Sequence, residues 1–143
     1  SLTYSNEGRL LVFKVGGDAA LPAPTIRDRS IPERDIKGID TSSIARGEIA
    51  YNENCAVCHG FLVRSGGAIP DLRRMSDETI AIWDQIVIDG LWSANGMAGF
   101  GDVLTRDQSG DLLNYVLARA EEDRLVAVGE KDMPQMTWLT GGD

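Results

Sequence analysis

The stretch Cys55-Ala56-Val57-Cys58-His59 decides how we interpret the rest of the chain. It places two thiols three residues apart on one helical turn, followed at once by an imidazole. Thiols at that spacing can reach the two vinyl groups of one porphyrin, and the histidine then lies beneath the ring. This is the attachment signature of a c-type haem. We therefore predict that Cys55 and Cys58 carry one covalent haem c and that His59 binds its iron.

Two other interpretations of these residues fit the sequence less well. A structural zinc site needs four ligands, and the chain holds only two cysteines and one histidine, so a carboxylate would have to complete the set. A disulfide between Cys55 and Cys58 is the other alternative, as in thioredoxin-like proteins. That motif follows a buried strand, whereas the residues before Cys55 have a helical pattern. If both cysteines carry haem, none is left for a structural disulfide.

The length of 143 residues predicts one compact domain with flanking segments. The longest apolar stretch, residues 80–88, is interrupted by Asp84 and Gln85, so we predict no membrane span. The chain starts at a serine, and we expect that processing or truncation removed what came before. Bacteria attach haem c outside the cytoplasm, which predicts the periplasm. The net charge of −8 argues against nucleic acid. It suits either steering toward a basic partner or plain solubility.

Four segments follow from composition. Residues 1–20 contain an apolar, β-branched run at 10–15 between turn signals, which predicts an isolated strand. A lone strand cannot satisfy its own edges, so we expect it to belong to a larger body. Residues 21–40 carry three prolines among charged side chains, which predicts a linker that crosses a surface. Residues 41–120 form the globular part, and residues 121–143 are predicted to be an acidic tail.

Three helices are predicted within the globular part. The first is capped by residues 41–43 and runs to about residue 54. The second is capped by Ser76 and ends at Gly90. In the third, Thr105 and Gln108 form a capping box, and the helix runs to about residue 120.

Glycine in a helix interior costs roughly 1 kcal/mol relative to alanine, so Gly47 suggests close approach of another helix. Tyr51 lies on the same face of the first helix. We predict that Leu112 and Tyr115 of the last helix pack against this face and close the domain around the haem.

Several residues are predicted to hold the porphyrin. The Pro70 carbonyl could accept the second N–H of His59, and Leu72 could then lie against the ring. The alternative is an ordinary proline-containing loop. The Trp83 indole N–H is a candidate partner for a haem propionate, and so are the side chains of Arg73 and its neighbour Arg74. A core tryptophan and a solvated arginine pair are the alternatives.

Met97 is the predicted sixth ligand of the iron. It lies at the centre of the glycine-rich loop 91–101, and small residues let such a loop approach a flat ring closely. A thioether opposite a histidine raises the reduction potential of haem iron. Met75, which directly precedes a helix cap, and Met133 and Met136 in the tail are weaker candidates. A lone methionine is usually core filler.

The order of these features resembles a class I cytochrome c domain over residues 41–120. The features are Gly47 with Tyr51, the CxxCH motif at 55–59, Pro70-Asp71-Leu72, Met97, and Leu112 with Tyr115. The resemblance implies an all-α fold, a small helical bundle around one covalently bound haem. Ala98 departs from the pattern, because many relatives have proline after the methionine.

The whole chain resembles the C-terminal part of quinohaemoprotein alcohol dehydrogenases, on residues 45–48, 54–60, 69–73 and 95–97. In that family a β-propeller holds pyrroloquinoline quinone (PQQ) and calcium, and a linker leads to a cytochrome c domain that takes electrons from the reduced quinone. The resemblance implies that residues 1–20 are the end of a propeller otherwise absent from this chain. The chain alone would then transfer electrons without oxidising alcohol.

The same resemblance implies a soluble electron acceptor, a blue-copper protein or another cytochrome, or delivery to the respiratory chain. A free-standing soluble cytochrome c is the first alternative, although such a carrier has no need of the strand and linker. A haem enzyme or gas sensor with an open distal site is the second, and it requires that Met97 not bind the iron.

Overall fold

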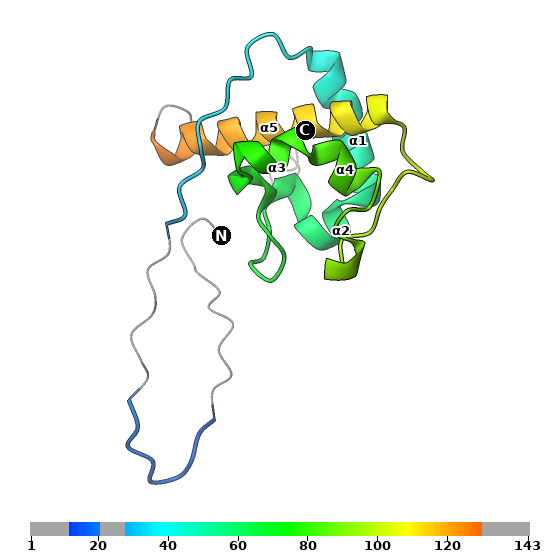
Figure 1. The fold of residues 1–143 in the computed structure, drawn as a ribbon. Helices are drawn as coiled ribbons and strands as arrows, with labels where there is room; N and C mark the ends of the chain where they lie inside the picture. The colour runs from blue at the N-terminus through cyan, green and yellow to red at the C-terminus, as the bar shows by residue number, and fades with distance from the viewer. Residues whose placement is uncertain (1–11, 21–27, 130–143) are drawn as a thin grey trace, which may run out of the picture.

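The computed structural model describes residues 12–20 and 28–129 (Figure 1). Within these ranges the chain forms helices and no strand, as expected for the all-α class I cytochrome c fold. None of the described helices is long and apolar enough to cross a membrane. The elements are α1 (Thr41–Asn54), α2 (Ala56–His59), η1 (Phe61–Val63), η2 (Leu72–Arg74), α3 (Asp77–Ala81), α4 (Trp83–Val87), η3 (Ser93–Asn95) and α5 (Arg106–Ala127).

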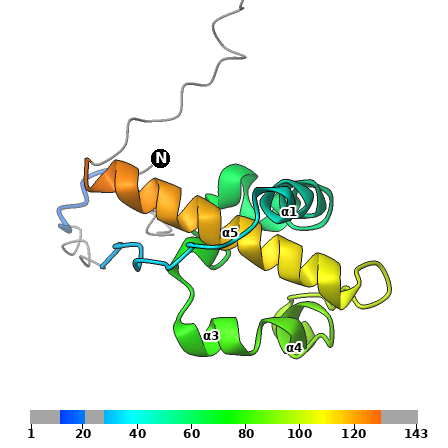
Figure 2. The same ribbon diagram turned by 90° about the horizontal axis from the view of Figure 1, so that it is seen from above.

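Helices α1 and α5 form the centre of the fold. Figure 2 shows α1 nearly end-on while α5 runs across the picture, so the two cross steeply, and α3 and α4 lie on the other side of α5. A Cβ atom on Gly47 would lie 2.0 Å from the carbonyl oxygen of Asp111, so only glycine fits at the crossing. The Tyr51 and Tyr115 rings meet with centroids 5.3 Å apart. Leu112 is fully buried beside them. The predicted packing of these helices is confirmed.

Helix boundaries follow local capping chemistry. Asp40 caps α1, because its carboxylate accepts the backbone N–H of Ser42 at 3.1 Å. The prediction that residues 41–43 cap this helix was therefore wrong by one residue. Ser76 caps α3 as predicted. The single helix predicted after it is broken at Ile82, which has φ −108° and ψ 18°, and continues as α4.

The last helix is longer than predicted. Its start is confirmed, with Thr105 and Gln108 forming a capping box. It continues past residue 120 to Ala127, so the first part of the predicted acidic tail is helical. Glu121 and Asp123 are buried, and their pairing with arginines offsets the cost of burying charge. The rest of the predicted tail, residues 130–143, lies outside the described residues.

The predicted N-terminal strand is not formed over its described part. Val12, Phe13 and Val15 are exposed, and the chain turns where the Gly17 N–H donates to the Lys14 carbonyl at 3.0 Å. A strand needs a partner for its backbone groups, and none pairs with this segment among the described residues. Residues 1–11 lie outside the description.

Residues 28–40, here called the linker strap, lie over the domain (Figure 2). The backbone N–H of Arg34 donates to Glu121 Oε2 on α5 at 3.1 Å. Its guanidinium forms an ion pair with Asp77 and donates to the Met75 carbonyl. The Arg74 side chain holds the strap at a second point, donating to the Arg29 carbonyl at 2.9 Å. Residues 28–40 thus run across the domain, and residues 21–27 of the predicted linker lie outside the described residues.

Candidate haem site

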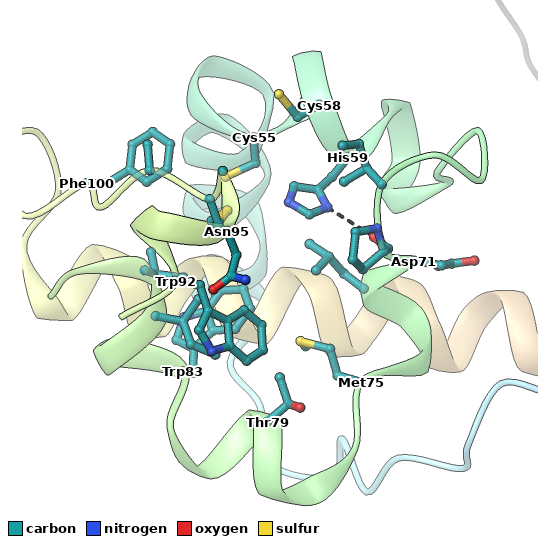
Figure 3. Close-up of a pocket in the computed structure, with 18 of the residues that line it drawn as sticks. Cys55, Cys58, His59, Asp71, Met75, Thr79, Trp83, Trp92, Asn95 and Phe100 are labelled. Atoms are coloured by element: carbon teal, nitrogen blue, oxygen red, sulfur yellow. Dashed lines mark hydrogen bonds between the residues drawn. The ribbon is translucent and has the colours of Figure 1, made fainter. Parts of the chain in front are cut away.

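A cavity of about 530 Å³ lies beside α2 (Figure 3). Its wall is built by α2, by residues 69–76, by α4 and by residues 92–100. The volume falls in the range of roughly 300–1,000 Å³ that is typical of cofactor sites. The apolar side chains on the wall are Ile69, Pro70, Leu72, Met75, Trp83, Ile86, Val87, Trp92, Met97, Ala98 and Phe100.

The predicted attachment motif forms one helical turn at the edge of this cavity. The backbone N–H groups of Cys58 and His59 both donate to the Cys55 carbonyl, at 3.1 and 2.9 Å. Both thiols are free, and both line the cavity, with Cys55 buried and Cys58 exposed. Burial raises the pKa of Cys55 to about 11, so its thiol keeps its proton at neutral pH. The pair therefore presents two thiols to one face of the cavity.

The zinc alternative finds no support in residues 12–20 and 28–129. These ranges contain no group of three or more His, Cys, Asp or Glu side chains that could hold a metal ion. The disulfide alternative is not what the structure shows, since neither Cys55 nor Cys58 is bridged. The donor set that is present, two thiols and one imidazole on an apolar cavity, fits a covalently attached haem.

His59 is oriented by the loop that returns to it. It is almost fully buried, and its Nδ1 lies 3.2 Å from the Pro70 carbonyl oxygen (Figure 3). A carbonyl can only accept, so Nδ1 carries the proton and Nε2 keeps its lone pair. Burial lowers the pKa of His59, and the bond to Pro70 acts in the opposite direction. The result is a neutral imidazole with a free Nε2, the state that binds iron.

Two methionines reach the cavity wall. Met97 is half-buried and follows Gly96, which has a left-handed φ of 90°. Met75 is buried and lines the same cavity. The sequence made it a weaker candidate ligand than Met97, because it directly precedes a helix cap. Met97 stays the predicted iron ligand. Met133 and Met136 lie outside the described residues.

The loop that carries Met97 is held by backbone contacts. The Phe100 N–H donates to the Val87 carbonyl at 2.7 Å. A Cβ atom on Gly99 would lie 2.8 Å from the Cα atom of Gly90, so the two glycines pack without room for a side chain. This glycine contact restrains the loop directly after Ala98.

Trp83 does not have a free indole N–H for a propionate. Its Nε1 donates to the Ser109 carbonyl at 3.1 Å and to the Ser109 hydroxyl at 3.0 Å. These bonds tie α4 to α5, and they satisfy a group that must find a partner when buried. The ring of Trp83 still lines the cavity, and so does the side chain of Leu72.

The Arg73 side chain also has partners within the protein. It is buried, its guanidinium binds Asp71 at 2.7 Å and Asp123 at 2.7 Å, and its side chain does not line the cavity. The Arg73 guanidinium therefore has two carboxylate partners where a propionate was predicted. Arg74 does line the cavity, although it pairs with Asp71 at 2.9 Å.

Sequence reasoning missed three features of the site. Trp92 and Asn95 lie on the cavity wall (Figure 3), and neither side chain makes a hydrogen bond with a described residue. Asp123 lies under the loop that carries Pro70 and binds three arginines. The LWSAN stretch before Met97 offered a signal for the first two, but a single aspartate in a charged segment offered none for the third.

Comparison with known proteins places this site in a family. Residues 42–116 match the family described as cytochrome c oxidase, cbb3-type, subunit III. Quinohemoprotein alcohol dehydrogenase ADH IIB of Pseudomonas putida is 38% identical over 120 residues, which cover 82% of this chain and 17% of that protein. The 1-butanol dehydrogenase (cytochrome c) of Thauera butanivorans is 34% identical over 120 residues, with coverage of 82% and 17%.

A solved structure agrees with these matches. The quinohemoprotein alcohol dehydrogenase ADHIIG of Pseudomonas putida superposes with a TM-score of 0.67 at 33% identity, covering 80% of this chain and 16% of that one. The chain therefore resembles the cytochrome c portion of these enzymes, and it spans about one sixth of their length.

Proposed function

The chain belongs to the family described as cytochrome c oxidase, cbb3-type, subunit III, and from this premise we propose that it carries one covalent haem c ligated by His59 and Met97. When bound, haem c supplies a one-electron ferric–ferrous couple. The observation that carries the proposal is the free Nε2 of His59, held by Pro70 beside two free thiols on an apolar cavity.

Each residue has a definite task in this proposal. The Cys55 and Cys58 thiols would hold the haem covalently beside α2. His59 would bind the iron through Nε2, while its Nδ1–H donates to the Pro70 carbonyl. Met97 would supply the second protein ligand from its loop, and an iron held by two protein ligands would need little reorganisation on electron transfer.

The remaining polar groups on the wall are proposed to receive the propionates. Arg74, Trp92 and Asn95 line the cavity, whereas the N–H of Trp83 and the guanidinium of Arg73 bond elsewhere. Most of the wall is apolar, which would limit water at the iron and favour electron transfer over ligand chemistry.

We propose that the electrons come from reduced PQQ in a calcium-containing β-propeller joined to the N-terminal side of this chain, in the bacterial periplasm. Relatives named quinohemoprotein alcohol dehydrogenase support this assignment. Val12, Phe13 and Val15 are 86%, 88% and 102% exposed, which is unusual for apolar side chains and suits a segment covered by another domain. A blue-copper protein or another cytochrome would then accept the electrons.

A free-standing carrier is the second candidate. The exposed segment at residues 12–15 and the linker strap argue against it, because neither contributes to the cavity. The two candidates are separated by adding alcohol to the proposed protein that joins this chain to the propeller and following the haem spectrum. Rapid reduction of the haem supports the PQQ donor. A haem that stays oxidised beside reduced quinone contradicts it.

The ligand set is tested by the visible spectrum of the oxidised holoprotein. We expect the weak long-wavelength sulfur-to-iron band in wild type, its loss in Met97→Ala, and its retention in the matched control Met75→Leu, which removes the other thioether on the wall. Loss in Met75→Leu instead would reassign the ligand. A wild-type protein that lacks the band and binds carbon monoxide at once would support the open-site enzyme or sensor.

A further inference from the structure

A buried carboxylate lies behind the histidine side of the cavity. Asp123 has no exposed surface, yet its pKa lies below the ordinary value of 3.8. Burial acts to raise this pKa, but hydrogen bonds from Arg64 and Arg73 and the charge of Arg119 outweigh it. A buried charge of this kind is tolerated only when its partners are complete.

Asp123 joins the two ends of the loop that follows the histidine. Arg64 donates to it twice, from Nε at 2.9 Å and from Nη2 at 2.7 Å. Arg73 donates from Nη1 at 2.7 Å. Arg64 lies on the stretch leaving His59, and Arg73 lies on the stretch that returns to the cavity. One carboxylate on α5 therefore holds both.

The network reaches the histidine through a single residue. Arg73 donates from Nε and Nη2 to the two oxygens of Asp71, at 2.9 and 2.7 Å. Asp71 follows Pro70 directly, and its carboxylate also accepts the Arg73 backbone N–H at 3.2 Å. The Pro70 carbonyl in turn accepts from His59 Nδ1. Contacts thus run without a gap from α5 to the ring nitrogen.

The backbone at the start of this loop is strained. Leu62 and Val63 have φ values of 55° and 62°, and a β-branched residue rarely adopts such a conformation. Strain of this kind persists only where the surroundings over-determine it. The buried Val63 side chain and the paired guanidinium of Arg64 supply that restraint.

We propose that Asp123 and Arg73 are positioning residues for the proximal histidine, which fix the Pro70 carbonyl on His59 Nδ1 and thereby set the reduction potential of the haem. This inference rests on the proposed function, because it concerns His59 as an iron ligand. A partner on the outer nitrogen of a ligating imidazole raises the basicity of the ligand. Greater basicity favours the ferric state, so loosening the loop shifts the equilibrium toward ferrous iron.

The test compares Arg73→Lys with Arg46→Lys in the holoprotein. Both variants keep the charge and replace a forked guanidinium by an ammonium. Arg46 pairs with Asp111 at 2.6 Å between α1 and α5, far along the helix from the loop, and serves as the control. The readouts are the reduction potential and the hydrogen-exchange rate of His59 Nδ1–H, followed by NMR.

Arg73→Lys is expected to raise the exchange rate and to shift the ferrous–ferric ratio toward ferrous iron, each on the order of tenfold; tenfold is about 59 mV for one electron. Arg46→Lys is expected to match wild type. Equal values in both variants would overturn the proposal and leave the network a purely structural one. Should Arg73→Lys not fold, Arg64→Lys, at a half-buried position, is judged by the same criterion.

Failure of this inference differs from failure of the proposed function. If His59 and Met97 ligate the iron but the network does not position the histidine, the long-wavelength band persists while the potential and exchange rate do not change. If the ligand assignment itself is wrong, the band is absent already in the wild-type protein, or it is lost in Met75→Leu instead of Met97→Ala.

Discussion

The two walls of the cavity are held by opposite means. On the histidine side, the loop between η1 and η2 is tied to α5 by buried ion pairs centred on Asp123. On the methionine side, the loop after α4 is held by backbone packing of Gly99 against Gly90 and by the Phe100–Val87 hydrogen bond. The first wall depends on the charges of Asp123 and its arginine partners. The second depends on the absence of side chains.

This difference assigns the two walls different weaknesses. Ion pairs fail when a partner is removed or protonated. A glycine contact is insensitive to pH, but it fails as soon as a methyl group is added. The histidine must keep one orientation to hold its hydrogen bond, whereas the methionine needs a backbone close to the ring.

Removing the central carboxylate should have the largest effect. Asp123→Asn leaves three arginines around a neutral amide, and we expect a loss of about 3–5 kcal/mol in the free energy of unfolding, the usual cost of breaking a buried ion pair. Denaturant unfolding of the holoprotein measures it. Asp111→Asn is the control on the same helix, where the loss should be about 1 kcal/mol or less because the Arg46 partner is exposed. Similar losses in both would remove the distinction between the walls.

Adding one methyl group on the other wall should have the next largest effect. In Gly99→Ala the new Cβ atom would lie 2.8 Å from Gly90 Cα and 3.1 Å from Gly90 N, and backbone atoms cannot move aside easily. We expect a loss of about 1–3 kcal/mol and a weaker sulfur-to-iron band. Gly66→Ala meets no atom within 4 Å and should change neither. An unchanged band in Gly99→Ala would show that the glycine contact does not place Met97.

The hydrogen bonds that join α4 to α5 through Ser109 should contribute less than the buried ion pairs. Ser109→Ala removes the hydroxyl that accepts from Trp83 Nε1 and donates to Asp84 at 2.7 Å. The Ser109 carbonyl still accepts the indole N–H, so we expect a loss of only about 1 kcal/mol. Thermal unfolding checks this value, with Ser93→Ala as an exposed serine control. A loss as large as that of Asp123→Asn would contradict the ranking of the buried ion pairs above these hydrogen bonds.

Lowering the pH should weaken the histidine-side wall before the methionine-side wall. Near neutral pH this is the smallest of the expected effects. Because the folded-state pKa of Asp123 lies below its ordinary value of 3.8, its contribution to stability is fully present above about pH 4 and is lost as pH falls through the lower, folded value. We expect the exchange rate of His59 Nδ1–H to rise in that acid range before the sulfur-to-iron band is lost. Loss of the band first would reverse the assignment of the pH-sensitive wall.

Local chemistry made much of this molecule predictable from sequence. The CxxCH turn, the Ser76 and Thr105 caps and the Gly47 contact each depend on a few neighbouring residues or on one unusual residue type. The approach of Pro70 to His59 was also expected, because iron-ligating imidazoles need a partner for the second nitrogen.

The contacts that the sequence did not reveal depend on partners distant in sequence. The Trp83 N–H needed an acceptor, but nothing near it in the chain pointed to Ser109 on α5. Arg73 was interpreted as a candidate propionate partner, and nothing in the charged segment around Asp123 singled that residue out. Their partners lie 50 residues apart, and only the fold brings them together. The predicted end of α5 was too early for the same reason.

The linker strap changes how a neighbouring domain would meet this one. A flexible tether spreads its end over a distance that grows with the square root of its free length. The local concentration it imposes falls as that length increases. Arg34 contacts α5 and α3, and the Arg29 carbonyl accepts from Arg74, so residues 29–40 do not add to the free length. Any body joined on the N-terminal side therefore pivots from the flank of α5 instead of from the tip of α1, and it searches a smaller volume.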